Sequence, residues 1–386
     1  MGASVHAVVL LLAPTSEKMK EVSLPEVSSH TEAEVGLVPT QANIYAMSPS
    51  QLSDSLNQLN QPTYRVRQIL EWIYEAGVTD FGEMSNLPKQ LRSMLAVRYS
   101  FGVLSLDTEQ RASDGTIKRL YRLPDQQLIE TVLMPYRDGR RTACISSQAG
   151  CAMRCAFCAT GQMGFARHLS ASEIFEQAQR FSSELQVQGE RLSNIVLMGM
   201  GEPFHNYENV LEAIELIRTR LGIGARRITV STVGLAPKIR QFAETGLQVK
   251  LAISLHSTID EQRGAIMPIN RKYPISELID SCRYYVEMTN RRVTFEWALI
   301  EGTNDSIEEA ERLARLLRNL KCHVNVIPLN PTAGYEGAAS SGASVNQFID
   351  HLNSRGIAAT VRVRRGIDID AGCGQLKSNV QKKRNS

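Results

Sequence analysis

From residue 142 onward the chain alternates between two hydrophobic patterns. Short apolar runs are typical of buried strands, and apolar residues that recur every three or four positions are typical of amphipathic helices. The short runs predict strands near residues 142–147, 194–198, 227–231, 249–255, 293–299, 323–329 and 359–363. The helical pattern falls between them, near residues 171–187, 207–220, 236–245, 275–289, 306–320 and 345–354. This alternation predicts an α/β fold with a parallel sheet, and about six such units predict an open, partial TIM-type barrel over residues 142–376.

Three further regions precede the barrel. Ser48, Pro49 and Gln51 have the spacing of a helix N-cap, first helical position and capping box, and helical periodicity continues to about residue 98. We therefore expect a small helical domain over residues 46–100. Residues 101–141 change to strand periodicity broken by turn sequences, which predicts a short antiparallel β extension. Residues 14–45 are rich in Ser, Thr, Glu and Pro, so we expect residues 1–45 to be a mostly disordered extension, and residues 377–386 form a basic tail.

Composition limits the class of protein. The 386 residues are 43% hydrophobic and 22% charged, which is ordinary for a globular protein, and the formal net charge of +3 is too small to indicate nucleic-acid binding by itself. Seven cysteines, three of them in one loop, do not fit a secreted disulfide framework, so we expect a reducing compartment, the cytoplasm. No apolar run is long enough for a transmembrane helix.

The strongest chemical signal is the segment from Cys151 to Cys158. Cys151, Cys155 and Cys158 have C-x3-C-x2-C spacing directly after the first predicted barrel strand. Thiolates hold Fe–S clusters and structural zinc, but zinc usually takes four protein ligands. A four-iron cluster held by three thiolates keeps one iron open for a substrate. The alternative is a zinc knuckle with Cys144 as the fourth ligand.

Polar residues follow several other predicted strands, where the chemistry of such barrels is located. Gly199-Met200-Gly201-Glu202-Pro203 combines glycines, which allow close approach to a ligand, with a carboxylate that can accept from an ammonium group. The ends of three later strands supply Ser231, Ser254-Leu255-His256 and Asn330. Cys373 lies between two glycines after the last strand, whereas Cys282 and Cys322 have the positions of core residues.

Taken together, residues from about 48 to 376 resemble the RlmN family, the radical S-adenosylmethionine (SAM) methyltransferases that act on C2 of adenosine in ribosomal and transfer RNA. The resemblance is carried by Ser146-Ser147-Gln148-Ala149-Gly150-Cys151, Gly199-Met200-Gly201-Glu202-Pro203, Ser254-Leu255-His256, Pro268-Ile269-Asn270 and Asp370-Ala371-Gly372-Cys373-Gly374-Gln375-Leu376. A related enzyme type, Cfr, methylates C8 of the same ribosomal adenosine and is the alternative.

The resemblance implies a role for each site residue. Cys373 carries the methyl group as S-methylcysteine, Glu130 accepts the proton from C2, and Cys144 forms a transient disulfide with Cys373. A [4Fe–4S] cluster is bound by Cys151, Cys155 and Cys158. Two molecules of SAM are consumed per turnover, and SAM is contacted by Gly201, Glu202, Ser231, Ser254, Leu255, His256 and Asn330.

The resemblance also implies the partners. The substrates are 23S rRNA, at the peptidyl transferase centre, and tRNA, at the adenosine 3′ of the anticodon. A flavodoxin or ferredoxin supplies electrons, and the enzyme is a monomer without a membrane partner. Two groups of cations are candidates for RNA contact or for a merely solvated surface. The first, in the helical domain, comprises Arg65, Arg67, Lys89 and Arg92, and the second, near the C-terminus, comprises Arg355, Arg362, Arg364, Arg365, Lys377, Lys382, Lys383 and Arg384.

Overall fold

A computed structural model describes residues 41–376 of the chain. Its centre is a set of seven parallel strands that are hydrogen-bonded in chain order. These strands are β6 (Arg141–Cys144), β9 (Asn194–Leu197), β10 (Ile228–Thr232), β11 (Lys250–Ser254), β12 (Val293–Leu299), β13 (Cys322–Pro328) and β14 (Ala359–Val361). Strand β14 ends the sheet and does not pair with β6, so the barrel is open, as predicted.

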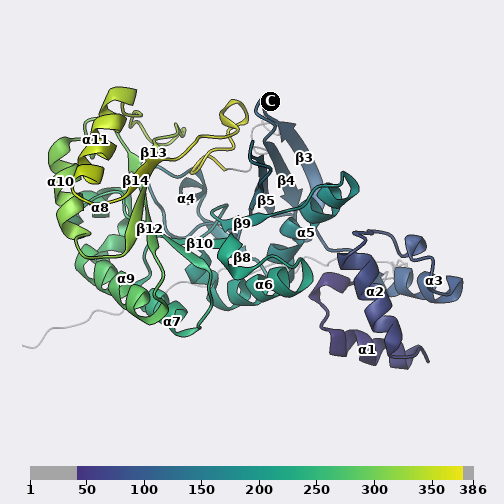
Figure 1. Cartoon of the computed structure of the whole chain (residues 1–386). Coiled ribbons are helices and arrows are strands. Elements are labelled where there is room, and N and C mark those ends of the chain that lie inside the picture. Colours follow the sequence, from purple (N-terminus) through teal and green to yellow (C-terminus); the bar gives the residue numbers. More distant parts are fainter. Residues whose placement is uncertain (1–40, 377–386) are drawn as a thin grey trace, which may run out of the picture. The chain divides into compact units, whose positions relative to one another are not determined.

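Amphipathic helices connect the barrel strands and lie along the outer side of the sheet (Figure 1). They are α5 (Ala171–Val187), α6 (Tyr207–Arg220), α7 (Ala236–Glu244), α8 (Asp260–Ile266), α9 (Ile275–Thr289), α10 (Ile307–Leu316) and α11 (Gly342–Ser354). The sequence predicted all of these except α8, which is too short to show a periodic pattern. It also missed α4 (Ala159–Met163) and the hairpin of β7 (Gln148–Gly150) and β8 (Phe165–His168).

The antiparallel strands continue the barrel sheet. Strands β3 (Ser105–Arg111), β4 (Ile117–Arg122) and β5 (Leu128–Pro135) pair in order, and β5 pairs with β6, so that one sheet contains ten strands. The first strand of this extension, β3, begins four residues after the start of the predicted region and runs to Arg111. Because β5 and β6 share hydrogen bonds, the extension is fixed to the strand that leads into the cysteine loop.

The first described residues form a small helical region with α1 (Pro49–Gln58), α2 (Tyr64–Tyr74), α3 (Lys89–Arg98) and the strand pair β1 (Ala42–Asn43) and β2 (Tyr99–Ser100). Ser48 caps α1 through the predicted capping box with Gln51. Residues 41–45 fall within the predicted extension, and Tyr45 among them is buried against Phe175 of α5, with 5.9 Å between ring centroids. The predictions for residues 1–40 and 377–386 lie outside the described residues.

Short 3-10 helices complete the elements: η1 (Ile44–Ala46), η2 (Phe81–Glu83), η3 (Pro203–Asn206), η4 (Ala225–Arg227), η5 (Pro268–Arg271) and η6 (Ile367–Ile369). No helix among the described residues is both long and apolar enough to cross a lipid bilayer.

The strand register decides which side chains face the barrel interior. Cys144 pairs with Val196, Ser231 with Ala252, and Ser254 with Glu296. Side chains alternate between the two faces of a strand, so partners in register share a face. The interior face therefore carries polar residues from β6 to β14, and this is the reverse of a simple apolar core.

Candidate active site

The cysteine loop is held at the end of β6 by backbone contacts. The N–H of Cys151 donates to the carbonyl of Gly164 at 2.7 Å, and the N–H of Ala156 donates to the carbonyl of Ile266 at 2.9 Å. Gly150 has φ +73°, and a Cβ there would lie 2.1 Å from the Gly164 oxygen, so only glycine permits this turn. The loop is thus fixed on two sides before any group binds to it.

The three thiols of the loop are largely withdrawn from water. Burial raises the pKa of Cys151 to about 12, and burial with the neighbouring thiols raises the pKa of Cys155 well above its usual value. Mutually repelling thiolates become stable when a cationic centre binds them, and three cysteines are a donor set for Fe–S clusters. Among residues 41–376 no three His, Cys, Asp or Glu side chains meet at a position for a single metal ion, whereas a four-iron cluster takes each thiolate on a different iron.

A cavity lies inside the barrel at the ends of the strands. It has about 880 Å³ of empty space when the open solvent at its entrance is included. The predicted site residues that line it are Cys155, Cys158, Gly201, Glu202, Ser231, Ser254, His256, Asn330 and Cys373. The fold therefore brings together residues from the first loop, four later strand ends and the last loop.

The segment after β9 forms one wall of this cavity. Gly201 has φ +104°, and a Cβ would lie 2.6 Å from the Cβ of Gln148. The Glu202 carboxylate accepts from the N–H groups of Phe204 at 3.0 Å and Val233 at 2.8 Å. Burial nevertheless raises the pKa of Glu202 to about 7. A carboxylate with four acceptor positions keeps capacity for a ligand ammonium group beside these two bonds.

Gln148 fixes the position of Glu202. Its side-chain oxygen accepts from the Glu202 N–H at 2.8 Å, and its amide nitrogen lies 3.0 Å from His168 Nδ1 and 3.1 Å from His205 Nδ1. Gln148 is fully buried. Gln148 belongs to the sequence pattern shared with the RlmN family, but it was not among the predicted site residues.

The opposite wall comes from the end of β11. His256 lies at φ +58°, its Nδ1 accepts from the Ala298 N–H at 2.8 Å, and burial with Arg263 nearby lowers its pKa to about 3. The ring is therefore neutral. Leu255, a predicted SAM contact, is fully buried and its side chain does not line the cavity.

Arg263 of α8 holds this wall together, although it was not among the predicted site residues. Its guanidinium donates to the carbonyls of Val233 at 2.7 Å, Ser254 at 2.9 Å and Leu255 at 3.0 Å, and to Asn270 Oδ1 at 2.9 Å. The side chain is fully buried. The Pro268-Ile269-Asn270 motif was the available signal, because Asn270 is the side-chain acceptor of Arg263.

The loop that carries Cys373 is anchored to both sides of the cavity. Asn330 Nδ2 donates to the Cys373 carbonyl at 3.0 Å, and Asn330 Oδ1 is buried without a hydrogen-bond partner among the described residues. The Ala159 N–H donates to the Gly374 carbonyl at 2.8 Å, which ties this loop to the helix after the cysteine loop. The unsatisfied Asn330 oxygen is consistent with a ligand donor in the cavity.

Cys144 and Cys373, far apart in the sequence, lie in one electrostatic neighbourhood. Burial and then Cys373 raise the pKa of Cys144 to about 12. The pKa of Arg362 is raised chiefly by Cys373, and also by Glu296 and Cys144. Arg362 Nη1 lies 3.5 Å from Glu296 Oε2 and donates to Met198 Sδ at 3.3 Å. Arg362 and Cys373 thus line the same cavity, and the charge of Arg362 lowers the pKa of Cys144 against the effect of burial.

This position corrects the prediction that Arg362 belongs to a phosphate-facing surface. Its side chain is 22% exposed and points into the barrel, because Thr360, two residues earlier, pairs in register with the inward-facing Asn325. Arg355 is paired with Glu311, and Arg365 with Asp114. In the helical region Arg67 is paired with Glu71, while Arg65 and Arg92 donate to backbone carbonyls.

Glu130 lies on β5 next to the cavity but not in its lining. Its side chain is 4% exposed, and Oε1 lies 3.7 Å from Lys118 Nζ. Lys118 in turn donates to the carbonyl of Asp370 at 3.3 Å, three residues before Cys373. Val132, two residues after Glu130, is the register partner of Cys144, so Glu130 and Cys144 face the same side of the sheet.

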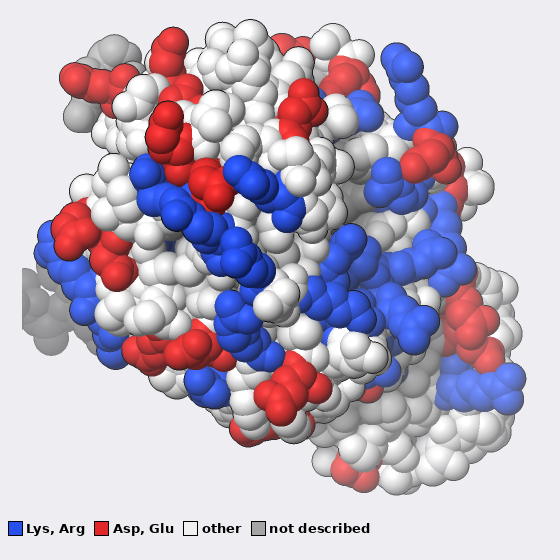
Figure 2. All heavy atoms as spheres, turned by 60° about the vertical axis from the view of Figure 1, so that its left-hand side comes forward, with Lys and Arg blue, Asp and Glu red and all other residues white. Residues whose placement is uncertain are grey.

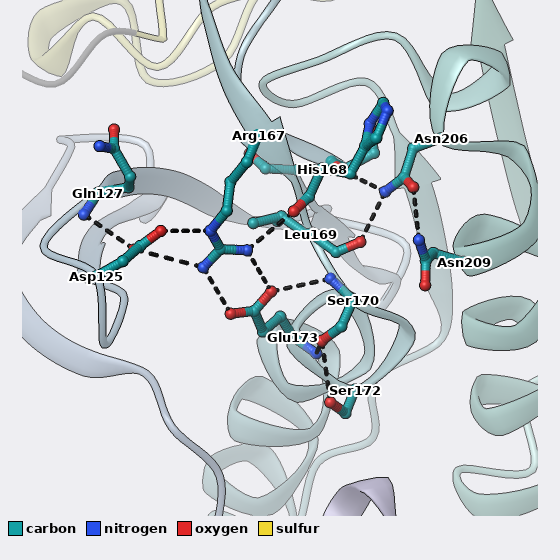
Figure 3. A network of polar contacts seen from close by, with 12 residues as sticks. Asp125, Gln127, Arg167, His168, Leu169, Ser170, Ser172, Glu173, Asn206 and Asn209 are labelled. Carbon is teal, nitrogen blue, oxygen red and sulfur yellow. Dashed lines mark hydrogen bonds and ion pairs between the residues drawn. The ribbon is translucent and has the colours of Figure 1, made fainter.

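The β7–β8 hairpin, whose strands enclose the cysteine loop, is clamped by an ion network (Figure 3). Arg167 of β8 makes a bidentate pair with Glu173 in the first turn of α5, with both N···O distances 2.8 Å, and also binds Asp125 in the β4–β5 turn. Asn206 donates to the carbonyls of Ser147 and Leu169 at 2.8 and 2.7 Å. Bidentate charge-assisted bonds are among the strong polar contacts, so this region is a rigid support.

An open parallel barrel whose first strand leads into a C-x3-C-x2-C loop is the arrangement of radical SAM enzymes, which use a [4Fe–4S] cluster and SAM. Sequence comparison agrees: the Radical SAM superfamily profile matches residues 145–317, and the profile of the ribosomal RNA large subunit methyltransferase N-terminal domain matches residues 42–100.

Relatives extend this match to most of the chain. A dual-specificity RNA methyltransferase RlmN 1 of Myxococcus xanthus is 48% identical over 89% of this chain and 96% of its own length. A probable dual-specificity RNA methyltransferase RlmN of Geobacillus kaustophilus is 44% identical over 89% of this chain and 94% of the relative. The crystal structure of a radical SAM methyltransferase from Sphaerobacter thermophilus superposes with a TM-score of 0.84 at 49% identity, covering 87% of this chain and 99% of that one.

The chain therefore belongs to the RlmN family of radical SAM RNA methyltransferases.

Proposed function

We propose that the protein methylates C2 of adenosine in 23S rRNA and in tRNA, with Cys373 as the methyl carrier. The observation that supports this most is that Cys373 lines the cavity together with Cys155 and Cys158, and that its charge also influences the pKa of Cys144. A cofactor site alone needs neither of these two thiols. A pair of thiols at its edge fits a reaction in which one sulfur carries the methyl group and the other releases the product.

The residues present fit both cofactors. Cys151, Cys155 and Cys158 would hold the [4Fe–4S] cluster, and the buried acceptors Glu202 and Asn330 fit the polar end of SAM, with Gly201, Ser231, Ser254 and His256 along the cavity wall. When bound, the cluster and SAM supply the one-electron chemistry that adenine C2 requires, because this electrophilic carbon does not attack the methyl group of SAM directly.

The chain's own residues complete the reaction. Joining C2 through a methylene to the sulfur of Cys373 leaves one unpaired electron on the adenine ring. That electron would pass to a one-electron acceptor, which the [4Fe–4S] cluster would supply when bound, and Glu130 takes the proton that C2 carried. The Cys144 thiolate then attacks the Cys373 sulfur, a Cys144–Cys373 disulfide forms, and the C–S bond breaks with its electron pair on the methylene carbon. That carbon takes up a proton and becomes the methyl group. The disulfide must be reduced before the next turnover.

The partners follow from the same proposal. The helical domain over residues 46–100 and the barrel opening would contact RNA, and a low-potential flavodoxin or ferredoxin would supply electrons. We place the enzyme in the cytoplasm as a monomer, together with ribosomes and tRNA. The related C8 methylation is not favoured, because the named relatives are RlmN enzymes.

The decisive experiment is nucleoside analysis of RNA treated with the anaerobically reconstituted enzyme. Mass spectrometry against standards should find 2-methyladenosine, and 8-methyladenosine instead would refute the C2 assignment. Cys373→Ala should give no methylated RNA, so wild-type turnover by this variant would refute the methyl-carrier role. Cys144→Ala should accumulate a covalent RNA–protein adduct. Iron analysis of the brown reconstituted protein tests the zinc alternative, which predicts stoichiometric zinc and no visible absorbance.

A further inference from the structure

Cations are not evenly spread over the surface. Figure 2 shows Lys and Arg side chains gathered densely beside a hollow, with Asp and Glu mostly around the edge of this group. Like charges that gather without counter-charges repel one another, so such a group indicates an anionic partner. Independently of this view, the strand register places a set of Lys and Arg residues next to one another, at the end of the barrel opposite to the cysteine loop.

This set lies where the barrel strands begin. Leu251 pairs with Val293 and Val293 with Cys322, so the residues that precede these three, Lys250, Arg292 and Lys321, form a row across three adjacent strands. Adjacent strands lie about 4.8 Å apart, which brings the three cations to neighbouring positions. The same register places Arg227 before β10 and Arg140 before β6.

All five cations lie an even number of residues from an inward-facing position of the same strand, so their side chains belong to the inner face of the barrel. Lys250 lies two residues before Ala252, and Arg292 lies two residues before Thr294. Ala252 and Thr294 pair in register, on the same inward face as the pair Ser254 and Glu296. Side chains two apart on a strand share a face. We call the five residues Arg140, Arg227, Lys250, Arg292 and Lys321 the basic mouth of the barrel.

The cations of the basic mouth influence one another. Burial lowers the pKa of Lys250, and Arg291, Arg140 and Arg292 lower it further. Among the described residues, one ion pair involves the mouth, between Arg140 and the exposed Asp138. Lys321 binds only the backbone and side-chain oxygens of Asn290, at 2.8 and 3.0 Å. Four positive charges are therefore not neutralised by a described carboxylate.

The geometry points to the backbone of an RNA as the partner of the basic mouth, and this inference rests on the RNA substrate proposed above. A row of cations across successive strands is longer than one phosphate group, whereas a chain of phosphodiesters can meet several of them at once. The mouth lies at the N-terminal ends of the strands and the cysteine loop at their C-terminal ends. It would therefore hold a part of the RNA remote from the reacting adenosine.

The test uses the double variant Lys250→Gln/Arg292→Gln in the reconstituted holoenzyme. Its matched control is Arg315→Gln/Arg318→Gln, which removes the same charge from two exposed residues at the end of α10. Binding of full-length tRNA is measured against salt concentration. Each lost phosphate contact lowers the slope of log K against log salt by about one, so we expect a loss of about two in slope and at least tenfold in affinity.

A short oligonucleotide that carries only the target adenosine separates the two proposals. We expect the double variant to bind and methylate it like the wild type. If the double variant binds tRNA with the slope and affinity of the control, the basic mouth does not contact RNA. If pyrophosphate binds at the mouth while the tRNA slope is unchanged, the partner is a small anion and the RNA assignment is wrong. If the wild type methylates neither RNA, the proposed function fails, whatever the slopes show.

Discussion

Replacing Arg362 by Met tests the polar interior of the barrel. The change removes the guanidinium that lies 3.5 Å from the Glu296 carboxylate and leaves Glu296 with Asn325 Nδ2 as its hydrogen-bond donor at 2.7 Å. Breaking a buried ion pair costs about 3–5 kcal/mol. Because Arg362 keeps 22% exposure and the pair is long, we expect a loss of roughly 2–3 kcal/mol in the free energy of unfolding.

The pH dependence of this loss has a definite sign. Burial already raises the pKa of Glu296, and Arg362 opposes that rise. Without Arg362 the pKa of folded Glu296 rises further above its unfolded value, so the folded variant is helped by proton uptake as the pH falls. The difference from the wild type should therefore be largest at neutral to alkaline pH and shrink toward the unfolded pKa of a glutamate.

A second substitution separates stability from chemistry. Arg362→Met/Glu296→Gln should recover stability to within about 1 kcal/mol, because no charge is left unpaired. It should not recover release of the RNA adduct, since the guanidinium that lowers the pKa of Cys144 is still missing. One unit in the Cys144 pKa changes its thiolate fraction about tenfold, so we expect at least tenfold slower release on quenched denaturing gels.

A variant that conserves the positive charge at position 362 serves as the control. Arg362→Lys keeps a positive charge and should restore part of the release rate. If denaturant unfolding shows no loss in the single variant, or no recovery in the double variant, then Arg362 and Glu296 are not an interacting buried pair. If both variants release the adduct at the wild-type rate, the guanidinium does not assist the thiols.

Other predictions concern single groups. Since the pKa of Cys144 is raised to about 12, adduct release should accelerate about tenfold per pH unit through the neutral and mildly alkaline range, and a plateau near neutrality would contradict this. Gly201→Ala places a Cβ 2.6 Å from the Gln148 side chain, so equilibrium dialysis should show at least tenfold weaker SAM binding. The control is Gly264→Ala, whose Cβ meets nothing within 4 Å. Equal losses of SAM affinity in the two variants would refute the steric argument. Buried Glu176 accepts from two backbone N–H groups, so Glu176→Gln should cost about 1–3 kcal/mol in denaturant unfolding, whereas unchanged stability would show that these bonds contribute nothing.

The sequence predicts the barrel well because the spacing of hydrophobic residues follows directly from which side of each strand and helix is buried. Buried parallel strands and amphipathic helices leave strong patterns, and most predicted bounds fall within a few residues of the observed ones. Short elements leave little pattern, so α8 and the β7–β8 hairpin were missed. The roles proposed for Cys144 and Cys373 came from the resemblance, since no local pattern relates two such distant thiols.

The positions of two arginines, Arg263 and Arg362, could not be predicted from the sequence pattern. Arginine is usually exposed, so a fully buried Arg263 with four acceptors is not expected from a short helix. Arg362 lies between Val361 and Val363, which are 43% and 66% exposed. The strand thus turns its apolar residues outward and its cation inward, because the barrel interior is a polar site. The cations of the basic mouth likewise become neighbours only through strand register.

The anchoring of the Cys373 loop has a consequence for how the enzyme is made. Residues 373–376 close the cavity through bonds to Asn330 and to the helix after the cysteine loop, and they belong to the last part of the chain to be synthesised. Domains fold from the N-terminus during translation, so the barrel and its three loop cysteines emerge before the methyl carrier exists. A chain that terminates before residue 373 would retain the donors for the cluster but carry no methyl acceptor. If Cys373 is the methyl carrier, as proposed, the nascent protein cannot methylate the ribosome that makes it until Cys373 has been added.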